Sequence, residues 1–184
     1  DDLHRVDHLP PAPLDRDGVG AFMSDNLAVT AADVAFSYGD RQALCGVSFV
    51  VEAGASFGFL GPNGSGKSTL FKLLSTIVPQ QAGAITMLGH DLGRDPAAIR
   101  RRIGVVFQSP AVDKRLTVHE NLRYAGLLLN LGGKELSARI DEALGAAILT
   151  DRRGDAVEEL SGGLRRRVEI AKCLMARPDL VLLD

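Results

Sequence analysis

The chain has 184 residues, of which 46% are hydrophobic, and a formal net charge of -2, which favours one globular domain with a substantial core. The longest uncharged stretch, Leu73 to His90, is interrupted by Pro79 and Gly83, so we expect no membrane-spanning helix. The first residues lack the basic flank and apolar run of a secretory signal, and a cytoplasmic location is therefore expected.

The opening residues 1–22, DDLHRVDHLPPAPLDRDGVGAF, have three prolines and no hydrophobic periodicity. They hold five Asp and two Arg, so the remainder of the chain is close to neutral and gives no electrostatic signature for nucleic acid. This composition predicts either a disordered tail or residues translated upstream of a true start at Met23. We favour the second interpretation.

Short strands are predicted next, because apolar runs are broken by Gly and Asp over residues 27–60. The runs are LAVTAADVAFSY, ALCGVSFVVEAG and ASFGFL, and they suggest a small antiparallel sheet leading into a buried strand. The apolar residues of STLFKLLSTIV then recur at helical spacing until Pro79.

Two further strands, AITMLG and IGVVFQ, precede a mostly helical segment over residues 117–149. A helix is expected after Ser161, which has the side chain of an N-cap residue, and Pro178 bounds it. The final DLVLLD reads as a buried strand that ends on the carboxylate of Asp184. The sequence therefore predicts the α/β class.

The cysteines and histidines carry no recognisable metal or redox spacing. We expect Cys45 and Cys173 to be free, buried thiols in a reducing compartment. The four histidines are His4, His8, His90 and His119, and surface or satisfied positions are expected for them.

GPNGSGKS fits the phosphate-binding pattern G-x-x-x-x-G-K-[ST]. Its glycines allow the backbone to aim successive N–H groups at phosphate oxygens, and the following helix adds the positive end of its dipole. Lys67 would contact the β- and γ-phosphates and the Ser68 hydroxyl a magnesium ion. A Gly-rich surface turn is the alternative. The expected ATP-binding residues here are Gly61, Pro62, Asn63, Gly64, Ser65, Gly66, Lys67, Ser68 and Thr69.

A second glycine-containing helix start, LSGGLRRRVEIAK, lies at residues 160–172. Its Ser-Gly-Gly turn leaves backbone N–H groups unobstructed and is a second potential anion site. By itself it could equally be an ordinary capped helix, because such turns are common.

Together, GPNGSGKST, LSGGLRRRVEIAK and LVLLD resemble, in this order, the ATP-binding cassette (ABC) family over residues 27–184. The resemblance implies a P-loop NTPase core with a mostly parallel sheet, an N-terminal antiparallel β subdomain and an inserted helical subdomain at about 110–160. It also implies that Ser161, Gly162 and Gly163 contact ATP held by a partner subunit in a head-to-tail homodimer. Leu164 stands where the family most often has glutamine.

Three more positions match the family. Tyr38 lies where an aromatic ring stacks on adenine, although a packed core tyrosine is the alternative. Gln108 matches a glutamine that supports catalysis by reaching magnesium and the attacking water. Asp184 matches the strand-end carboxylate that holds magnesium, so the expected metal residues are Ser68, Gln108 and Asp184. The expected cofactors are ATP and Mg²⁺.

SPAVDKRLTVHENL and the triplet Arg165, Arg166 and Arg167 look like exporter ATPases that serve separate permeases in drug, haem or polysaccharide efflux. The arginines could form a solvated helix face or a brace near the neighbouring nucleotide. The expected function is an ATPase subunit at the cytoplasmic face of a membrane, partnered by an integral membrane permease.

The family's catalytic glutamate would follow Asp184 and its switch histidine would come later, so no catalytic base is expected within the 184 residues. We therefore expect a C-terminally truncated fragment that binds ATP weakly or not at all and hydrolyses it negligibly. Two alternatives remain: a non-transport cassette ATPase acting on nucleic acid or ribosomes, and a module that binds ATP without turnover. Only 92 residues separate Ser68 from Ser161, without a long heptad run, which favours the exporter.

Overall fold

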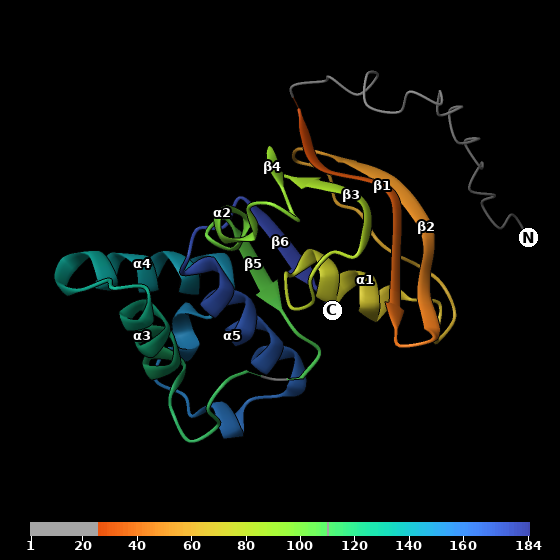
Figure 1. Ribbon diagram of the computed structural model, residues 1–184. Coiled ribbons are helices and arrows are strands. Elements are labelled where there is room, and N and C mark those ends of the chain that lie inside the picture. Colours follow the sequence, from red (N-terminus) through yellow and green to blue (C-terminus); the bar gives the residue numbers. More distant parts are fainter. Residues whose placement is uncertain (1–25, 110) are drawn as a thin grey trace, which may run out of the picture.

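The structure, a computed structural model, describes residues 26–109 and 111–184. The extension expected over residues 1–22 lies outside the described residues. Two sheets and a helical cluster make up the described chain, with the parallel strands in the middle, between the antiparallel sheet and helices α3 and α4 (Figure 1). The predicted α/β class, with an antiparallel sheet at its N-terminal side, is confirmed.

The antiparallel sheet has the strand order β2-β1-β3-β4. β1 (Leu27–Tyr38) and β2 (Arg41–Glu52) form a hairpin, and β1 also pairs with β3 (Ala82–Met87). β4 (His90–Asp91) is a short edge strand. The β1–β2 hairpin turns tightly at Gly39, which has a positive φ of 56°.

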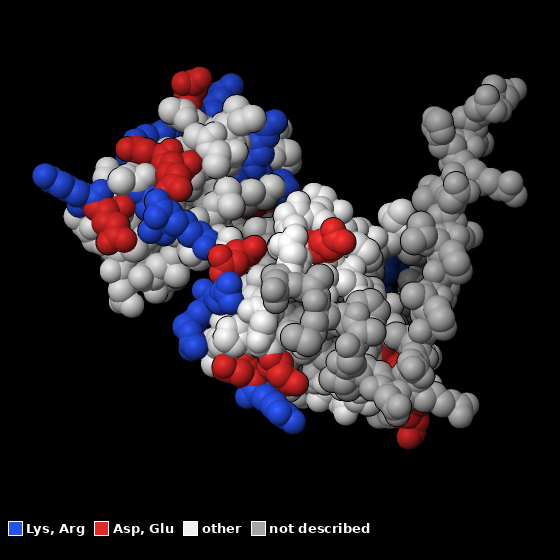
Figure 2. All heavy atoms as spheres, turned by 90° about the horizontal axis from the view of Figure 1, so that it is seen from above, with Lys and Arg blue, Asp and Glu red and all other residues white. Residues whose placement is uncertain are grey.

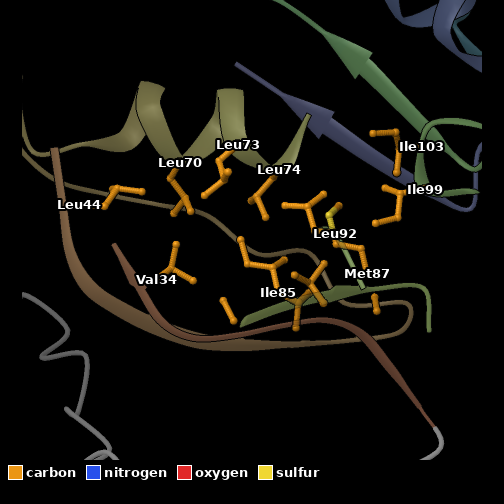
Figure 3. Close-up of a cluster of buried hydrophobic side chains, with 14 of the residues drawn as sticks. Val34, Leu44, Leu70, Leu73, Leu74, Ile85, Met87, Leu92, Ile99 and Ile103 are labelled. Carbon is orange, nitrogen blue, oxygen red and sulfur yellow. The ribbon is translucent and has the colours of Figure 1, made fainter. Parts of the chain in front are cut away.

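Helix α1 (Lys67–Leu74) lies on one face of this sheet and closes the first hydrophobic core. Leu70, Leu73 and Leu74 are its buried residues and point toward the strands (Figure 3). The labelled side chains from the rest of this core are Val34, Leu44, Ile85, Met87, Leu92, Ile99 and Ile103. Burial of this continuous apolar surface is the main force that holds α1, with the loop before it, against the sheet.

The second sheet is a parallel pair of β5 (Ile103–Val106) and β6 (Leu180–Leu183), preceded by the short helix α2 (Pro96–Arg100). Their register pairs Ile103 with Leu180 and Val106 with Leu183. The two carboxyl ends therefore lie side by side, a frequent place for ligands in α/β proteins. An ion pair of 2.7 Å joins Arg102 to Asp179 at the opposite end.

Between β5 and β6 the chain forms the second hydrophobic core. Its helices are α3 (Val118–Leu128), α4 (Gly133–Ala146) and α5 (Gly162–Leu174), with 3-10 turns at Thr150–Arg152 and Val157–Glu159. Apolar residues at helical spacing, including Leu122, Ile140 and Val168, are almost completely buried. The helices predicted from the sequence are confirmed here.

Helix α5 also packs tightly on β5. A Cβ atom at Gly104 would overlap the Cys173 sulfur and the Pro178 ring, so only glycine permits this approach. The same burial raises the pKa of the Cys173 thiol.

Three details differ from the predictions. Residues 55–60 were expected as a strand, but no described segment pairs with them, and Phe57 and Leu60 are exposed. Helix α1 ends at Leu74 rather than near Pro79, because Thr76 adopts a positive φ of 60° and the Ile77 N–H turns back to the Lys72 carbonyl. Both cysteines are free, but neither is fully buried as expected: Cys45 is exposed and Cys173 is half-buried.

Candidate functional site

The loop formed by residues 61–66 connects residues 55–60 to α1 and rests against β2. Gly66 has a φ of 92°, and a Cβ atom there would lie 2.6 Å from the Ala43 carbonyl oxygen. Gly64 has a φ of 82° but open space around it. Both glycines therefore permit a left-handed backbone, and Gly66 also permits contact with β2.

Lys67 folds back over this loop. Its Nζ donates hydrogen bonds to the carbonyl oxygens of Gly61 (2.6 Å) and Pro62 (2.7 Å) and approaches the Ser65 hydroxyl at 3.4 Å. Lys67 is the first residue of α1, so its positive charge and the N–H groups of the first helical turn lie at the same end of the helix. The loop, Lys67 and the following Ser68 and Thr69 thus form one cationic cradle at the N-terminal end of α1, where Lys67 and Thr69 are half-buried.

The ends of β5 and β6 meet near this cradle. The Asp184 N–H donates to the Val106 carbonyl at 3.0 Å, so Asp184 and Gln108 follow neighbouring strand ends, and both are exposed. The Phe71 ring of α1 contacts the Phe107 ring edge-on, with centroids 5.8 Å apart. Because Ser68 precedes Phe71 by one helical turn, its hydroxyl lies on the same face of α1.

Tyr38 is the last residue of β1. The residue is 46% exposed, and its ring meets the Phe36 ring at a centroid distance of 4.9 Å. This end of β1 lies close to the loop before α1. Phe36 pairs with Leu44 on β2, and the Leu44 side chain would meet a Cβ atom on Gly66. Tyr38 is therefore not a core residue.

Ser161 caps α5 as predicted: its hydroxyl accepts a hydrogen bond of 3.4 Å from the Leu164 N–H. Gly162 and Gly163 are exposed, and a Cβ atom on either would meet nothing within 4 Å. No hydrogen bond among the described residues links this turn to the loop before α1. The Ser-Gly-Gly turn is thus an open surface and not part of the same cradle.

The three arginines of the triplet do not share one role, either as a solvated helix face or as a brace near a neighbouring nucleotide. Arg165 donates to the carbonyls of Val157 (3.2 Å) and Glu158 (2.9 Å), just before the Ser-Gly-Gly turn. Arg166 donates to the carbonyls of Phe107 and Asp184, while Arg167 is exposed. Two of the three arginines therefore brace loops of their own chain.

Sequence reasoning missed Glu169, which is only 7% exposed. It forms an ion pair of 3.0 Å with Arg166 and accepts a hydrogen bond of 3.1 Å from the Ala111 N–H. Lys172 donates to the Ala111 carbonyl, and burial lowers its pKa while Glu169 and Asp113 act in the opposite direction. The available signal was an acid at the third position after Arg166, on the same helix face.

The described residues hold no group of three or more His, Cys, Asp or Glu side chains arranged for a metal ion. In the same part of the chain, no helix has the length and apolar character needed to cross a bilayer.

Comparison with known proteins relates these features to a family. A linearmycin-resistance ATP-binding protein of Bacillus subtilis is 40% identical over 154 residues, which are 84% of this chain and 50% of the relative. A daunorubicin-resistance ATP-binding protein of Streptomyces coeruleorubidus is 41% identical, over 85% of this chain and 50% of the relative. A Nod factor export ATP-binding protein of Rhizobium meliloti is 39% identical, over 86% and 47%. The chain thus spans about half the length of these relatives.

Solved structures agree. A subunit of the cbiONQ ABC transporter complex from Clostridium perfringens matches with a TM-score of 0.80 and 26% identity, over 87% of this chain and 66% of that one. A nucleotide-free ATP-binding cassette matches with a TM-score of 0.76 and 29% identity, over 86% and 68%. The family model described as ABC transporter matches residues 29–184, a span that includes the loop before α1, the Ser-Gly-Gly turn and β6. The chain therefore belongs to the ABC transporter family.

Proposed function

We propose that this chain is the ATP-binding and ATP-hydrolysing part of an ABC-type membrane exporter and that it energises a separate permease. The observation that carries the proposal is the cationic cradle of residues 61–69, adjacent to the polar strand ends at Gln108 and Asp184. The relatives are named for drug resistance and Nod factor export, which supports export as the transport direction.

In the cradle, the Lys67 ammonium group donates hydrogen bonds to two carbonyl oxygens of its own loop. A β- or γ-phosphate oxygen would compete for this ammonium group, because a charged acceptor forms a stronger hydrogen bond than a neutral carbonyl. The backbone N–H groups at the start of α1 would bind the same phosphates, and the ring of the exposed Tyr38 would stack on the adenine.

The donor set fits magnesium. Ser68, Gln108 and Asp184 offer only hydroxyl, amide and carboxylate oxygens, which are the ligands that this hard cation prefers. When bound, Mg²⁺ would neutralise charge on the β- and γ-phosphates. Gln108, at the end of β5, would orient the attacking water through its side-chain amide.

The exposed Ser-Gly-Gly turn supports a head-to-tail homodimer. Gly162 and Gly163 have neither a positive φ nor a close neighbour, so the isolated fold does not require glycine at these positions. Glycine there would serve the close approach of a second molecule and its γ-phosphate. ATP would thus join Lys67 of one subunit to Ser161 of the other in the closed dimer, and it would favour that state by these additional contacts.

The nucleic-acid alternative is less well supported. On the face drawn in Figure 2, acidic and basic side chains lie next to one another instead of forming a continuous basic patch. The formal net charge of -2 points the same way. A pull-down separates the functions: recovery of a membrane permease supports export, and recovery of nucleic acid or ribosomes would replace it with the alternative.

Lys67→Ala tests the proposal. ATP-dependent dimerisation of the complete protein that contains this chain, measured by light scattering, should be abolished, because the loop loses its only side-chain cation. Lys72→Ala is the matched control, since Lys72 is an exposed lysine of the same helix and should leave dimerisation unchanged. An undiminished dimer with Lys67→Ala would show the mechanism to be wrong.

A further inference from the structure

The side chain of Gln81 holds the backbone of β1 one residue before Tyr38. Its Oε1 accepts a hydrogen bond of 2.8 Å from the Ser37 N–H, and its Nε2 donates one of 3.0 Å to the Ser37 carbonyl. The glutamine amide thus offers β1 the same donor and acceptor that the backbone of a neighbouring strand would offer. The two partners also fix the orientation of the amide, because each can bond only one of its ends.

This contact lies where the pairing of β1 becomes irregular. The pairs between β1 and β3 end with Ala35 opposite Ala82, and the register between β1 and β2 shifts between Phe36 and Ser37. A register shift disrupts the ladder locally and leaves the strand less firmly held there. Gln81 therefore supplies from its side chain the hydrogen bonds that β3 would give Ser37 if its own pairing continued.

Two restraints consequently act on the ring of Tyr38. Residues two apart share one face of a strand, and the Tyr38 ring packs edge-on against the Phe36 ring, with centroids 4.9 Å apart. Phe36 is buried and anchors one side of the ring. Ser37, between the two aromatic residues, is held by Gln81. The backbone that carries Tyr38 is thus fixed, although this residue lies at the exposed end of a hairpin.

Gln81 also belongs to the connection that follows helix α1. This helix begins at Lys67 in the cradle and ends at Leu74, and the chain then passes through Gln81 into β3. The connection therefore links the proposed phosphate site at the start of α1 to the strand that carries Tyr38. A shift of that strand end away from the connection would have to break both hydrogen bonds of Gln81.

We propose that Gln81 is a positioning residue for the base of the nucleotide, because it holds Tyr38 where its ring can stack on the adenine while the phosphates lie in the cradle. The proposal rests on the function proposed above, which assigns the stacking to Tyr38 and the phosphates to the cradle. A nucleotide gains most from two sites whose separation is already set before it binds. Loss of Gln81 should therefore weaken recognition of the adenosine and leave recognition of the phosphates intact.

The structural step is tested by hydrogen exchange without nucleotide. Gln81→Ala removes the acceptor of the Ser37 amide proton and should accelerate its exchange about 5-fold or more. Gln80→Ala is the matched control. The Gln80 amide donates at 2.7 Å to the Gly83 carbonyl of β3 itself, so this variant should leave exchange at Ser37 unchanged. Unchanged exchange at Ser37 in Gln81→Ala would overturn the proposal.

The functional step is tested by calorimetry on the complete protein that contains this chain, with ADP and pyrophosphate as probes. The two probes share a diphosphate and differ in the adenosine, and neither has a γ-phosphate that could join two subunits. Gln81→Ala should weaken ADP binding about 5-fold and leave pyrophosphate binding within about 2-fold. Gln80→Ala should keep the ratio of the two affinities within about 2-fold. Equal losses for both probes in Gln81→Ala, or no loss for either, would overturn the proposal.

A double-mutant cycle shows whether Gln81 acts through Tyr38. Tyr38→Ala should weaken ADP binding about 10-fold, as expected for loss of one stack between a base and an aromatic ring. In the Tyr38→Ala background, Gln81→Ala should change ADP binding by less than about 2-fold. A further loss of about 5-fold would mean that Gln81 acts independently of the ring, contrary to the proposal.

Two further outcomes are separable. If Gln81→Ala does not fold, Gln81→Met removes both hydrogen bonds while keeping an unbranched stem, and the same selective loss of ADP binding is expected. An equal loss of pyrophosphate binding in that variant would overturn the proposal. If the unmodified protein binds neither probe, the proposed function is contradicted and the role of Gln81 with it. Normal binding of both probes with an unselective effect of Gln81→Ala contradicts only the role of Gln81.

Discussion

The glycine-rich loop before α1 and the glycine pair at the start of α5 differ in why they contain glycine. Gly64 and Gly66 adopt positive φ angles of 82° and 92°, and Gly66 also lies against β2. Gly162 and Gly163 have ordinary backbone angles and open surroundings. The first pair is required by the folded chain itself, whereas the second pair has no intramolecular reason to be glycine. Substitutions should therefore separate folding from function.

Gly66→Ala should have the largest effect on stability. The new Cβ atom would lie 2.6 Å from the Ala43 carbonyl oxygen in a backbone conformation that alanine disfavours. We expect a loss of about 3 kcal/mol in the free energy of unfolding, measured by urea titration. Gly64→Ala has the strained φ without the overlap and should cost only about 1 kcal/mol. Equal losses for the two variants would contradict the comparison.

Gly162→Ala and Gly163→Ala should impair dimerisation without destabilising the fold. Alanine favours a helix more than glycine does, so stability should be unchanged or rise by at most about 1 kcal/mol. ATP-dependent dimerisation of the complete protein should nevertheless fall at least about 10-fold, because the added methyl groups would occupy the space proposed for the partner's γ-phosphate. Thermal unfolding and light scattering on the same samples would test both statements. A marked loss of stability would mean that these glycines serve the fold.

The helix caps provide a smaller test of the same distinction. At the start of α3, Thr117 and Glu120 form a reciprocal capping box, with bonds of 2.8 and 3.2 Å to backbone N–H groups. At the start of α5, Ser161 makes one bond of 3.4 Å. Thr117→Ala should therefore destabilise the protein by about 1–2 kcal/mol, but Ser161→Ala by only about 0.5 kcal/mol. Chemical denaturation measures both, and a larger cost for Ser161→Ala would contradict this ranking.

The smallest expected effect is a pH dependence of the α3 cap. Hydrogen bonds to Thr117 lower the pKa of Glu120 below its ordinary value of 4.5. The unfolded chain therefore binds a proton more readily, so this stabilisation is present above about pH 4.5 and is lost as pH falls toward the folded pKa. The difference in melting temperature between the protein and Glu120→Gln should shrink over that interval. A constant difference would show that the carboxylate charge is not involved.

Local patterns predicted much of this molecule. The spacing of apolar residues identified the antiparallel sheet and helices α3 and α4, whereas α5 followed from the Ser161 cap and the Pro178 boundary. The strand expected at residues 55–60 was wrong, because a strand needs a neighbour whose position no local pattern reveals. Thr76 ended α1 through a left-handed conformation that threonine rarely adopts, so sequence reasoning placed the boundary too late.

Long-range polar contacts were the least predictable part of the site. Arg166, Glu169 and Lys172 read as a charged helix face, and their partners Phe107 and Ala111 lie some sixty positions earlier in the chain. Backbone carbonyls and amides are common to nearly all residues, so the sequence does not show which of them bind a distant side chain. Only the position of Glu169, three residues after Arg166 on the same helix face, carried a weak indication.

The parallel pairing of β5 with β6 has a consequence for the order of folding. Ile103 can pair with Leu180 only when the two ends of the long segment between β5 and β6 come together. Closing so long a loop is entropically unfavourable. The contacts among α3, α4 and α5 are more local and should form first. The helical cluster would then act as a preformed bridge for the two strands, and the polar strand ends at Gln108 and Asp184 would be among the last features to assemble.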